Sequence, residues 1–170
     1  MQIEKEVIER TKEMARNNFI SGLNCCESVF EALHSAGIIG EEDIPYSACK
    51  MCAGYGGGIG LAGYTCGALN GAVLAVGARY GRKDPKAEDA VCLYDKEYLR
   101  YNNMIHDFKV VNKGVLCKEI GADYKEDFNC PERKKLCESV VQSGVEIACR
   151  YLAMPDEEVE KLTYIVKKFE

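Results

Sequence analysis

Apolar residues recur every three or four positions along most of this 170-residue chain, with charged residues between them. This spacing is typical of amphipathic helices, and no stretch shows the sustained alternation of a half-buried strand. The sequence therefore predicts an all-α fold, a single-domain helical bundle over residues 1–170. We expect about seven helices, over 3–20, 25–36, 46–53, 66–80, 87–112, 130–151 and 156–170, and a short helical turn that carries Cys117 and ends at Gly121.

Residues typical of helix ends support both boundaries of the second helix, expected over 25–36. Asn24 is a good N-cap for the helix that begins at Cys25, and Gly37 is a typical stop signal after it. Cys25 and Cys26 then lie in the first turn, where unpaired backbone amides and the helix dipole favour a thiolate.

A glycine-rich stretch precedes the helix expected over 66–80. Ten of the sixteen glycines in the chain fall between Gly54 and Gly81. Glycine loses much conformational entropy on folding, so this density indicates unusual dihedral angles or close backbone approach. Small residues also line one face of the helix that follows, which we expect to be central and buried, with the glycine-rich loop just before it.

Residues 58–63 match the G-x-G-x-x-G string of dinucleotide-binding proteins. That motif works between a strand and a helix of a parallel sheet. The residues before it have a helical pattern and no strand follows, so we do not expect a nucleotide site.

The composition points to thiol chemistry. The chain has ten cysteines, a net charge of −5 and a pI near 5.2. The acidic balance gives no electrostatic reason to expect nucleic acid as a partner. The first residues are charged and the longest apolar run, 66–78, is too short to span a bilayer, so we expect a cytoplasmic protein with no signal peptide and no membrane insertion. In a reducing cytosol, many thiols suggest a metal, a cluster or thiol redox chemistry.

Local cysteine spacings leave alternatives open. Cys49 and Cys52 have the C-x-x-C spacing of a redox dithiol or of half a zinc site, but no second close pair follows. Two packed thiols explain this spacing equally well. Cys149 is expected in the core and Cys92 is expected to have no special role.

Five segments of the chain contain cysteine or glycine motifs in a fixed order. They are Asn-Cys-Cys-Glu-Ser-Val at 24–29, Gly-Gly-Gly-Ile-Gly at 56–60, Cys-Gly-Ala-Leu-Asn-Gly at 66–71, Cys-Lys-Glu-Ile-Gly at 117–121 and Cys-Glu-Ser-Val-Val at 137–141. Together they resemble the family of redox-active proteins named for its C_GCAxxG_C_C pattern. The resemblance extends over about residues 15–152, and the Cys-Gly-Ala-x-x-Gly element after a glycine loop is its most specific part.

The resemblance implies a helical, redox-active protein and places the four family cysteines on Cys25, Cys66, Cys117 and Cys137. Cys26 is an alternative to Cys25, and Cys130 is an alternative to Cys137. The matching glycine motifs imply a second set of residues near a cofactor, which comprises Gly58, Gly60, Gly67 and Gly71. Similar domains occur joined to haem-bearing segments with an iron–sulfur centre, but this chain has no C-x-x-C-H motif and we expect no covalent haem.

Three functional hypotheses follow. In the first, the four cysteines hold an iron–sulfur cluster, with [2Fe–2S] preferred, for electron transfer or redox sensing. In the second, the protein is a metal-free thiol–disulfide redox protein in which Cys25 or Cys66 is the low-pKa thiolate. In the third, zinc stabilises a structural or interaction protein. If the protein is an enzyme, we expect an oxidoreductase. Its redox partner protein is unknown. The tyrosine-rich face of 94–108 is compatible with a homodimer, and a core-facing stripe explains these tyrosines equally well.

Overall fold

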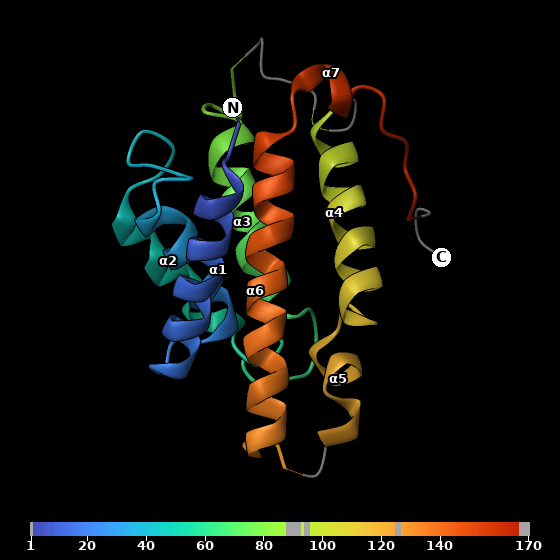
Figure 1. Ribbon diagram of the computed structural model, residues 1–170. Coiled ribbons are helices and arrows are strands. Elements are labelled where there is room, and N and C mark those ends of the chain that lie inside the picture. The colour runs from blue at the N-terminus through green and yellow to red at the C-terminus, as the bar shows by residue number, and fades with distance from the viewer. Residues whose placement is uncertain (1, 88–92, 94–95, 125–126, 167–170) are drawn as a thin grey trace.

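The chain forms a bundle of helices in the computed structural model, which describes residues 2–87, 93, 96–124 and 127–166. The long helix α6 (Pro131–Ala153) runs through the middle, with α1 (Lys5–Ile20) and α4 (Glu97–Asn112) on either side of it in Figure 1. The remaining helices are α2 (Cys25–Ser35), α3 (Gly67–Tyr80), the short α5 (Cys117–Ile120) and α7 (Asp156–Val159), and the 3₁₀ segments η1 (Tyr46–Tyr55) and η2 (Ala122–Tyr124).

The all-α prediction is confirmed. Within the described residues the only extended pairing is an isolated antiparallel bridge between Thr65 and Leu116. The predicted N-cap is also correct, because the Asn24 side chain accepts from the backbone N–H groups of Cys26 and Glu27 and the Glu27 side chain completes a capping box. Over the same residues, no helix is both long and apolar enough to cross a membrane.

Close approach of α2, α3 and α6 forms the centre of the core. Helix α6 packs against α1, α2, α3 and α4, and Val141, Val145 and Leu152 of its apolar stripe are fully buried. A Cβ at Gly144 of α6 would lie 3.0 Å from the Ala68 carbonyl oxygen of α3, so the two backbones almost touch. The sequence-based expectation that the helix with small residues is central and buried is therefore confirmed.

Two predicted helices are shorter in the structure. Helix α4 begins at Glu97 rather than 87, and Cys92 and most of the residues before α4 lie outside the described residues. Helix α7 covers Asp156–Val159 rather than 156–170. Residues 163–166 bond to α4 instead of continuing the helix: the Asn102 side chain accepts from the N–H groups of Ile165 and Val166 at 2.8 and 3.0 Å, and the Asn103 amide donates to the Thr163 carbonyl at 2.9 Å.

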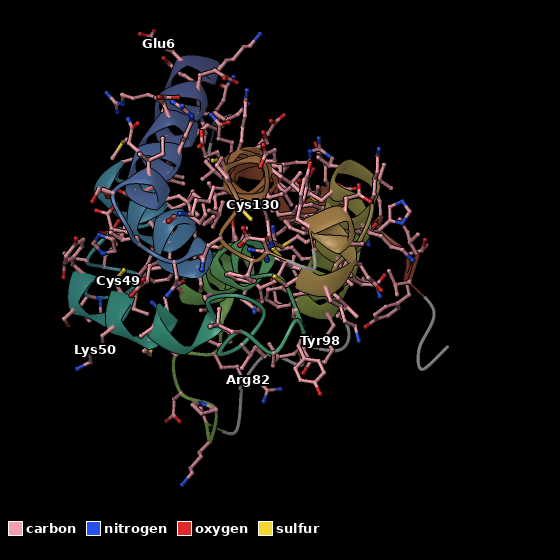
Figure 2. The ribbon with its side chains drawn as sticks, turned by 90° about the horizontal axis from the view of Figure 1, so that it is seen from below. Glu6, Cys49, Lys50, Arg82, Tyr98 and Cys130 are labelled. Carbon is pink, nitrogen blue, oxygen red and sulfur yellow. The ribbon has the colours of Figure 1, made fainter. Side chains whose placement is uncertain are left out.

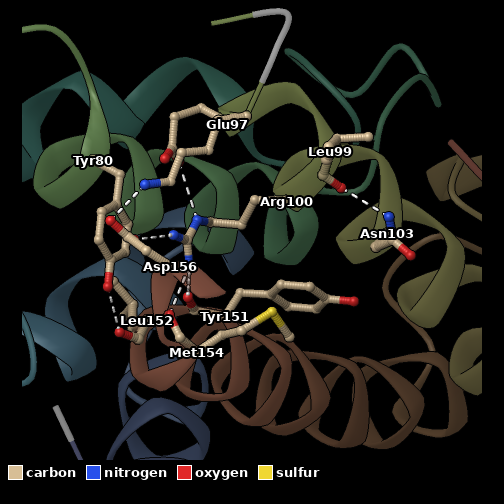
Figure 3. A network of polar contacts seen from close by, with 10 residues as sticks. Tyr80, Glu97, Leu99, Arg100, Asn103, Tyr151, Leu152, Met154 and Asp156 are labelled. Carbon is tan, nitrogen blue, oxygen red and sulfur yellow. Dashed lines mark hydrogen bonds and ion pairs between the residues drawn. The ribbon is translucent and has the colours of Figure 1, made fainter. Parts of the chain in front are cut away.

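A buried arginine closes one end of the bundle. Arg100 of α4 is fully buried, pairs with Glu97 at 3.0 Å and lies over the ring of Tyr80, with 3.9 Å from its guanidinium carbon to the ring centroid (Figure 3). It also donates to the backbone carbonyls of Tyr151 and Met154 at the end of α6. These carbonyls have no partner within the helix, so Arg100 supplies their hydrogen bonds and joins α3, α4 and α6.

Two glycines of α3 should respond in opposite ways to a methyl group. A Cβ at Gly71 would lie 2.7 Å from the Cys26 carbonyl oxygen, whereas one at Gly77 would meet only the Tyr101 hydroxyl, at an ordinary 3.5 Å. We predict that Gly71→Ala lowers the free energy of unfolding by about 1–3 kcal/mol through overpacking. Gly77→Ala should raise it by about 0.5–1 kcal/mol through helix propensity.

Urea unfolding followed by circular dichroism measures both changes in the same helix. Equal effects of the two alanines would contradict the close contact between α3 and the first turn of α2.

Candidate four-cysteine site

Four cysteines from four different elements line one cavity of about 180 Å³. Cys25 lies in the first turn of α2, Cys66 is the N-cap of α3, Cys117 begins α5 and Cys137 lies in the second turn of α6. Apolar side chains form most of the remaining wall: Phe19, Leu61, Ile120, Phe128, Leu136 and Val140. The structure thus brings together the four cysteines that the family resemblance implied.

Backbone pairing holds Cys66 beside Cys117. The N–H of Cys66 donates to the carbonyl of Val115 at 2.8 Å, and the N–H of Cys117 donates to the carbonyl of Tyr64 at 2.7 Å. These two bonds tie the segment before α3 to the segment before α5. Both cysteines are therefore fixed at the starts of their helices, at the edge of the same cavity.

The glycine-rich stretch forms a left-handed turn shortly before the segment that pairs with Val115 and Cys117. Residues 57–61 all have positive φ, between 58° and 72°. This conformation costs residues other than glycine about 1–2 kcal/mol of conformational free energy each. Ile59 and Leu61 both adopt it here. At Gly58 a Cβ would also lie 2.7 Å from the Cβ of Cys117, so glycine is required both for the turn and for the position of that cysteine.

The four glycines predicted near a cofactor have different positions. Gly67 lines the cavity, and a Cβ there would lie 3.0 Å from the Cβ of Cys25. Gly58 supports Cys117, and Gly71 packs against α2. Gly60 belongs to the left-handed turn, where a Cβ would meet no atom within 4 Å. Their binding of a cofactor stays a prediction.

Arg133 is a site residue that the sequence analysis missed. Its buried guanidinium donates from Nη2 to the Cys117 sulfur at 3.2 Å and lies 3.6 Å from the centroid of the Phe128 ring. It precedes Cys137 by four residues on α6, so both side chains lie on the same helix face. That spacing from a family cysteine is the signal that could have identified it.

The thiols of Cys25 and Cys137 are in contact, and their pKa values move in opposite directions. The Cys25 thiol donates a hydrogen bond to the Cys137 sulfur, which, with the positive charge of Arg133, lowers the pKa of Cys137 to about 7. The same bond, together with burial, raises the pKa of Cys25. Cys137 is therefore the thiol of the cavity that ionises most readily.

The expectation that a helix N-terminus would give Cys25 or Cys66 a low pKa is wrong. Burial raises the pKa of Cys66 to about 12, although the backbone N–H groups of Ala68 and Leu69 donate to its sulfur. Burial also raises the pKa of Cys117 despite the adjacent Arg133. In these positions loss of solvation outweighs the helix dipole.

The other described cysteines do not line the cavity. Cys130 is the N-cap of α6 and is absent from the cavity wall, so Cys137 rather than Cys130 is placed with the other three. Cys149 is fully buried in the core, as expected. Cys26, Cys49 and Cys52 also lie outside the cavity wall.

The four cysteines line a cavity, and they do not form a ready-made site for a single metal ion. In the described ranges, no three or more His, Cys, Asp or Glu side chains are arranged so that they could hold one metal ion. The arrangement therefore offers four thiols, one cation and two backbone donors around an apolar space.

Comparison with known protein families gives a match over most of the chain. The family model described as "Putative redox-active protein (C_GCAxxG_C_C)" matches residues 23–151, which include all four cavity cysteines. The chain belongs to this C_GCAxxG_C_C family. No curated protein and no solved structure matches the chain. The family description supports a redox-active, cysteine-rich protein and specifies no cofactor.

We predict that Cys137 is the first cavity thiol to react as the pH rises. In reduced, metal-free protein, alkylation of Cys137 by iodoacetamide should increase with a midpoint near pH 7, because its thiolate is stabilised by Cys25 and Arg133. Cys117 in the same sample should react with a midpoint well above that, because burial raises its pKa. Peptide mapping by mass spectrometry measures both rates.

Arg133→Gln removes the positive charge and should move the Cys137 midpoint to higher pH. A common midpoint for Cys137 and Cys117 would show that the contact with Cys25 does not control the ionisation.

Proposed function

We propose that this member of the C_GCAxxG_C_C family transfers electrons, or senses redox state, through an iron–sulfur cluster held by Cys25, Cys66, Cys117 and Cys137. The observation that carries the proposal is the convergence of these four thiols on one apolar cavity. Four cysteine thiolates are the usual ligand set of [2Fe–2S] and [4Fe–4S] clusters. We favour the [2Fe–2S] form.

The residues around the sulfurs suit an anionic cluster. Arg133 donates to the Cys117 sulfur, and the N–H groups of Ala68 and Leu69 donate to the Cys66 sulfur. Such donors stabilise the reduced form and raise the reduction potential.

The protein residues also prepare the thiols for binding. Ligation requires thiolates, and Cys137, with a pKa of about 7, is the first to lose its proton at neutral pH. Leu61 and Phe128 line the cavity while their side chains are 69% and 41% exposed. This edge is therefore where we place electron exchange with a partner protein.

A second function is favoured by the contact between Cys25 and Cys137. Two thiols joined by a hydrogen bond, one of them with a pKa near 7, are suited to reversible disulfide formation. In that metal-free reading Cys137 is the nucleophile and Cys25 is its partner. Cys137 thus takes the role of reactive thiolate that the sequence-based thiol–disulfide hypothesis gave to Cys25 or Cys66.

Metal and sulfide analysis separates these functions. Protein purified without oxygen should contain about two iron and two sulfide per chain and show visible absorption from sulfur-to-iron charge transfer. Cys117→Ser should lose most of the iron, because one ligand and its contact with Arg133 are removed.

Cys149→Ser is the matched control, since this buried cysteine lies outside the cavity, and it should keep the iron content of the unsubstituted protein. Colourless, iron-free protein after cluster reconstitution would refute the cluster. A Cys25–Cys137 disulfide in the same sample would then support the second function.

A further inference from the structure

Three more cysteines meet where α2 begins beside η1. Cys26 lies in the first turn of α2, and Cys49 and Cys52 lie on η1. The thiols of Cys26 and Cys49 both donate hydrogen bonds to the sulfur of Cys52. None of the three lines the four-cysteine cavity.

The 3₁₀ conformation of η1 aligns Cys49 with Cys52. Residues three apart are eclipsed in a 3₁₀ helix, and a rise of about 2.0 Å per residue places their Cα atoms about 6 Å apart. This separation lies within the range of about 4.4–6.8 Å found for disulfides.

Asn24 fixes η1 against α2. Its side-chain amide donates to the carbonyls of Cys52 and Ala53, both at 3.3 Å, while its oxygen accepts from the N–H of Cys26. One side chain thus holds the end of η1 and the first turn of α2 together. The contact between Cys26 and Cys52 therefore depends on the same residue that caps α2.

The three thiols differ in their exposure to solvent. Cys26 and Cys52 are fully buried, whereas Cys49 is half-buried and lies beside Lys50 near the outer edge of the molecule (Figure 2). A reagent from solvent therefore reaches Cys49 first.

We propose that Cys26, Cys49 and Cys52 form a second, metal-free thiol–disulfide site, in which Cys52 makes one reversible disulfide. Cys49 is the entry thiol, and Cys26 is an internal partner that can take its place. The site takes low-molecular-weight disulfides as oxidants and dithiols as reductants. It is independent of the cluster proposed for the four-cysteine cavity.

The exchange balances as two thiols oxidised for one disulfide reduced. The Cys49 thiolate attacks a disulfide R–S–S–R, forms a mixed disulfide and releases one thiolate RS⁻. Cys52 then attacks the Cys49 sulfur, forms the Cys49–Cys52 bond and releases the second RS⁻; the two protein protons convert both to RSH. Attack of Cys26 on Cys52 moves the bond to Cys26–Cys52 and returns Cys49 as a thiol.

The ionisation of the thiols controls the rate of this thiol–disulfide exchange. Burial, Cys52 and the carboxylates of Glu31 and Glu27 raise the pKa of Cys49 to about 11, so little of the entry thiol is ionised at neutral pH. The hydrogen bonds from Cys26 and Cys49 lower the pKa of Cys52. These properties fit a site that stores or senses oxidising equivalents slowly rather than one that turns over rapidly.

The two thiol sites are covalently adjacent. Cys25 faces the four-cysteine cavity and the next residue, Cys26, faces Cys52, so one peptide unit joins them. Backbone contacts with α3 at Gly67 and Gly71 hold this unit in place.

Disulfide mapping across a range of glutathione ratios tests the proposal. Reduced full-length protein is equilibrated anaerobically with reduced and oxidised glutathione, alkylated and cleaved with trypsin, Glu-C protease and chymotrypsin. Trypsin cleaves after Lys50, between Cys49 and Cys52; Glu-C cleaves after Glu27 and separates Cys26 from Cys49. We expect one disulfide that contains Cys52, joined to Cys49 or Cys26 and reversed by dithiothreitol.

Variants define the partners. Cys52→Ser should lose this disulfide completely, and Cys149→Ser should keep it. Cys49→Ser changes a half-buried residue, so it should fold and should retain only the Cys26–Cys52 linkage. Cys117→Ser should keep the Cys52 disulfide even where it loses iron, which separates failure of this proposal from failure of the cluster.

Recovery of Cys52 as an alkylated thiol at every glutathione ratio would overturn the proposal. The same conclusion would follow if Cys52 were linked to one and the same partner in Cys49→Ser and in Cys26→Ser, because that partner could then be neither Cys49 nor Cys26.

Discussion

Direct backbone contact between α3 and the first turn of α2 is the constraint on which both thiol sites depend. Side chains at Gly67 and Gly71 would collide with the backbone or Cβ atoms of Cys25 and Cys26. With glycine at both positions, the two consecutive cysteines are held between α3 on one side and η1 on the other. Any movement of α3 away from α2 would open both sites together.

Burial determines what the cavity thiols can do. An apolar wall and neighbouring sulfurs raise the pKa values of Cys25, Cys66 and Cys117, so three of the four resist ionisation as free thiols. Of the four cavity cysteines, only Cys137 has a lowered pKa. The cavity thus favours states in which sulfur charge is shared with a metal or removed by a covalent bond, which are the two functions considered for it.

Much of the helical framework could be predicted from periodicity and caps. Asn24 and the apolar stripe of α6 gave correct boundaries and a correct buried face. The 3₁₀ form of η1 could not be predicted from periodicity, and neither could the hydrogen bonds from the Asn24 side chain, distant in sequence, that hold its end. The path of residues 163–166 could not be predicted for a similar reason, since it depends on hydrogen bonds between their backbone and Asn102 of α4.

The site was predictable in its cysteines but not in its electrostatics. Motif order selected four thiols that the fold brings to one cavity, whereas Arg133 and the contact between Cys25 and Cys137 exist only after α6 packs beside α2 and α5. Glycine density indicated unusual dihedral angles or close backbone approach, but the left-handed conformation of Ile59 and Leu61 could not be predicted, because their local preference opposes it.

The intact mass of anaerobically prepared protein, measured by native mass spectrometry, tests the central claim most directly. The account predicts a main species that carries one iron–sulfur cluster, with four thiol protons lost on ligation. A species with the mass of the metal-free chain, or of the chain with a single zinc ion, after cluster reconstitution would contradict it.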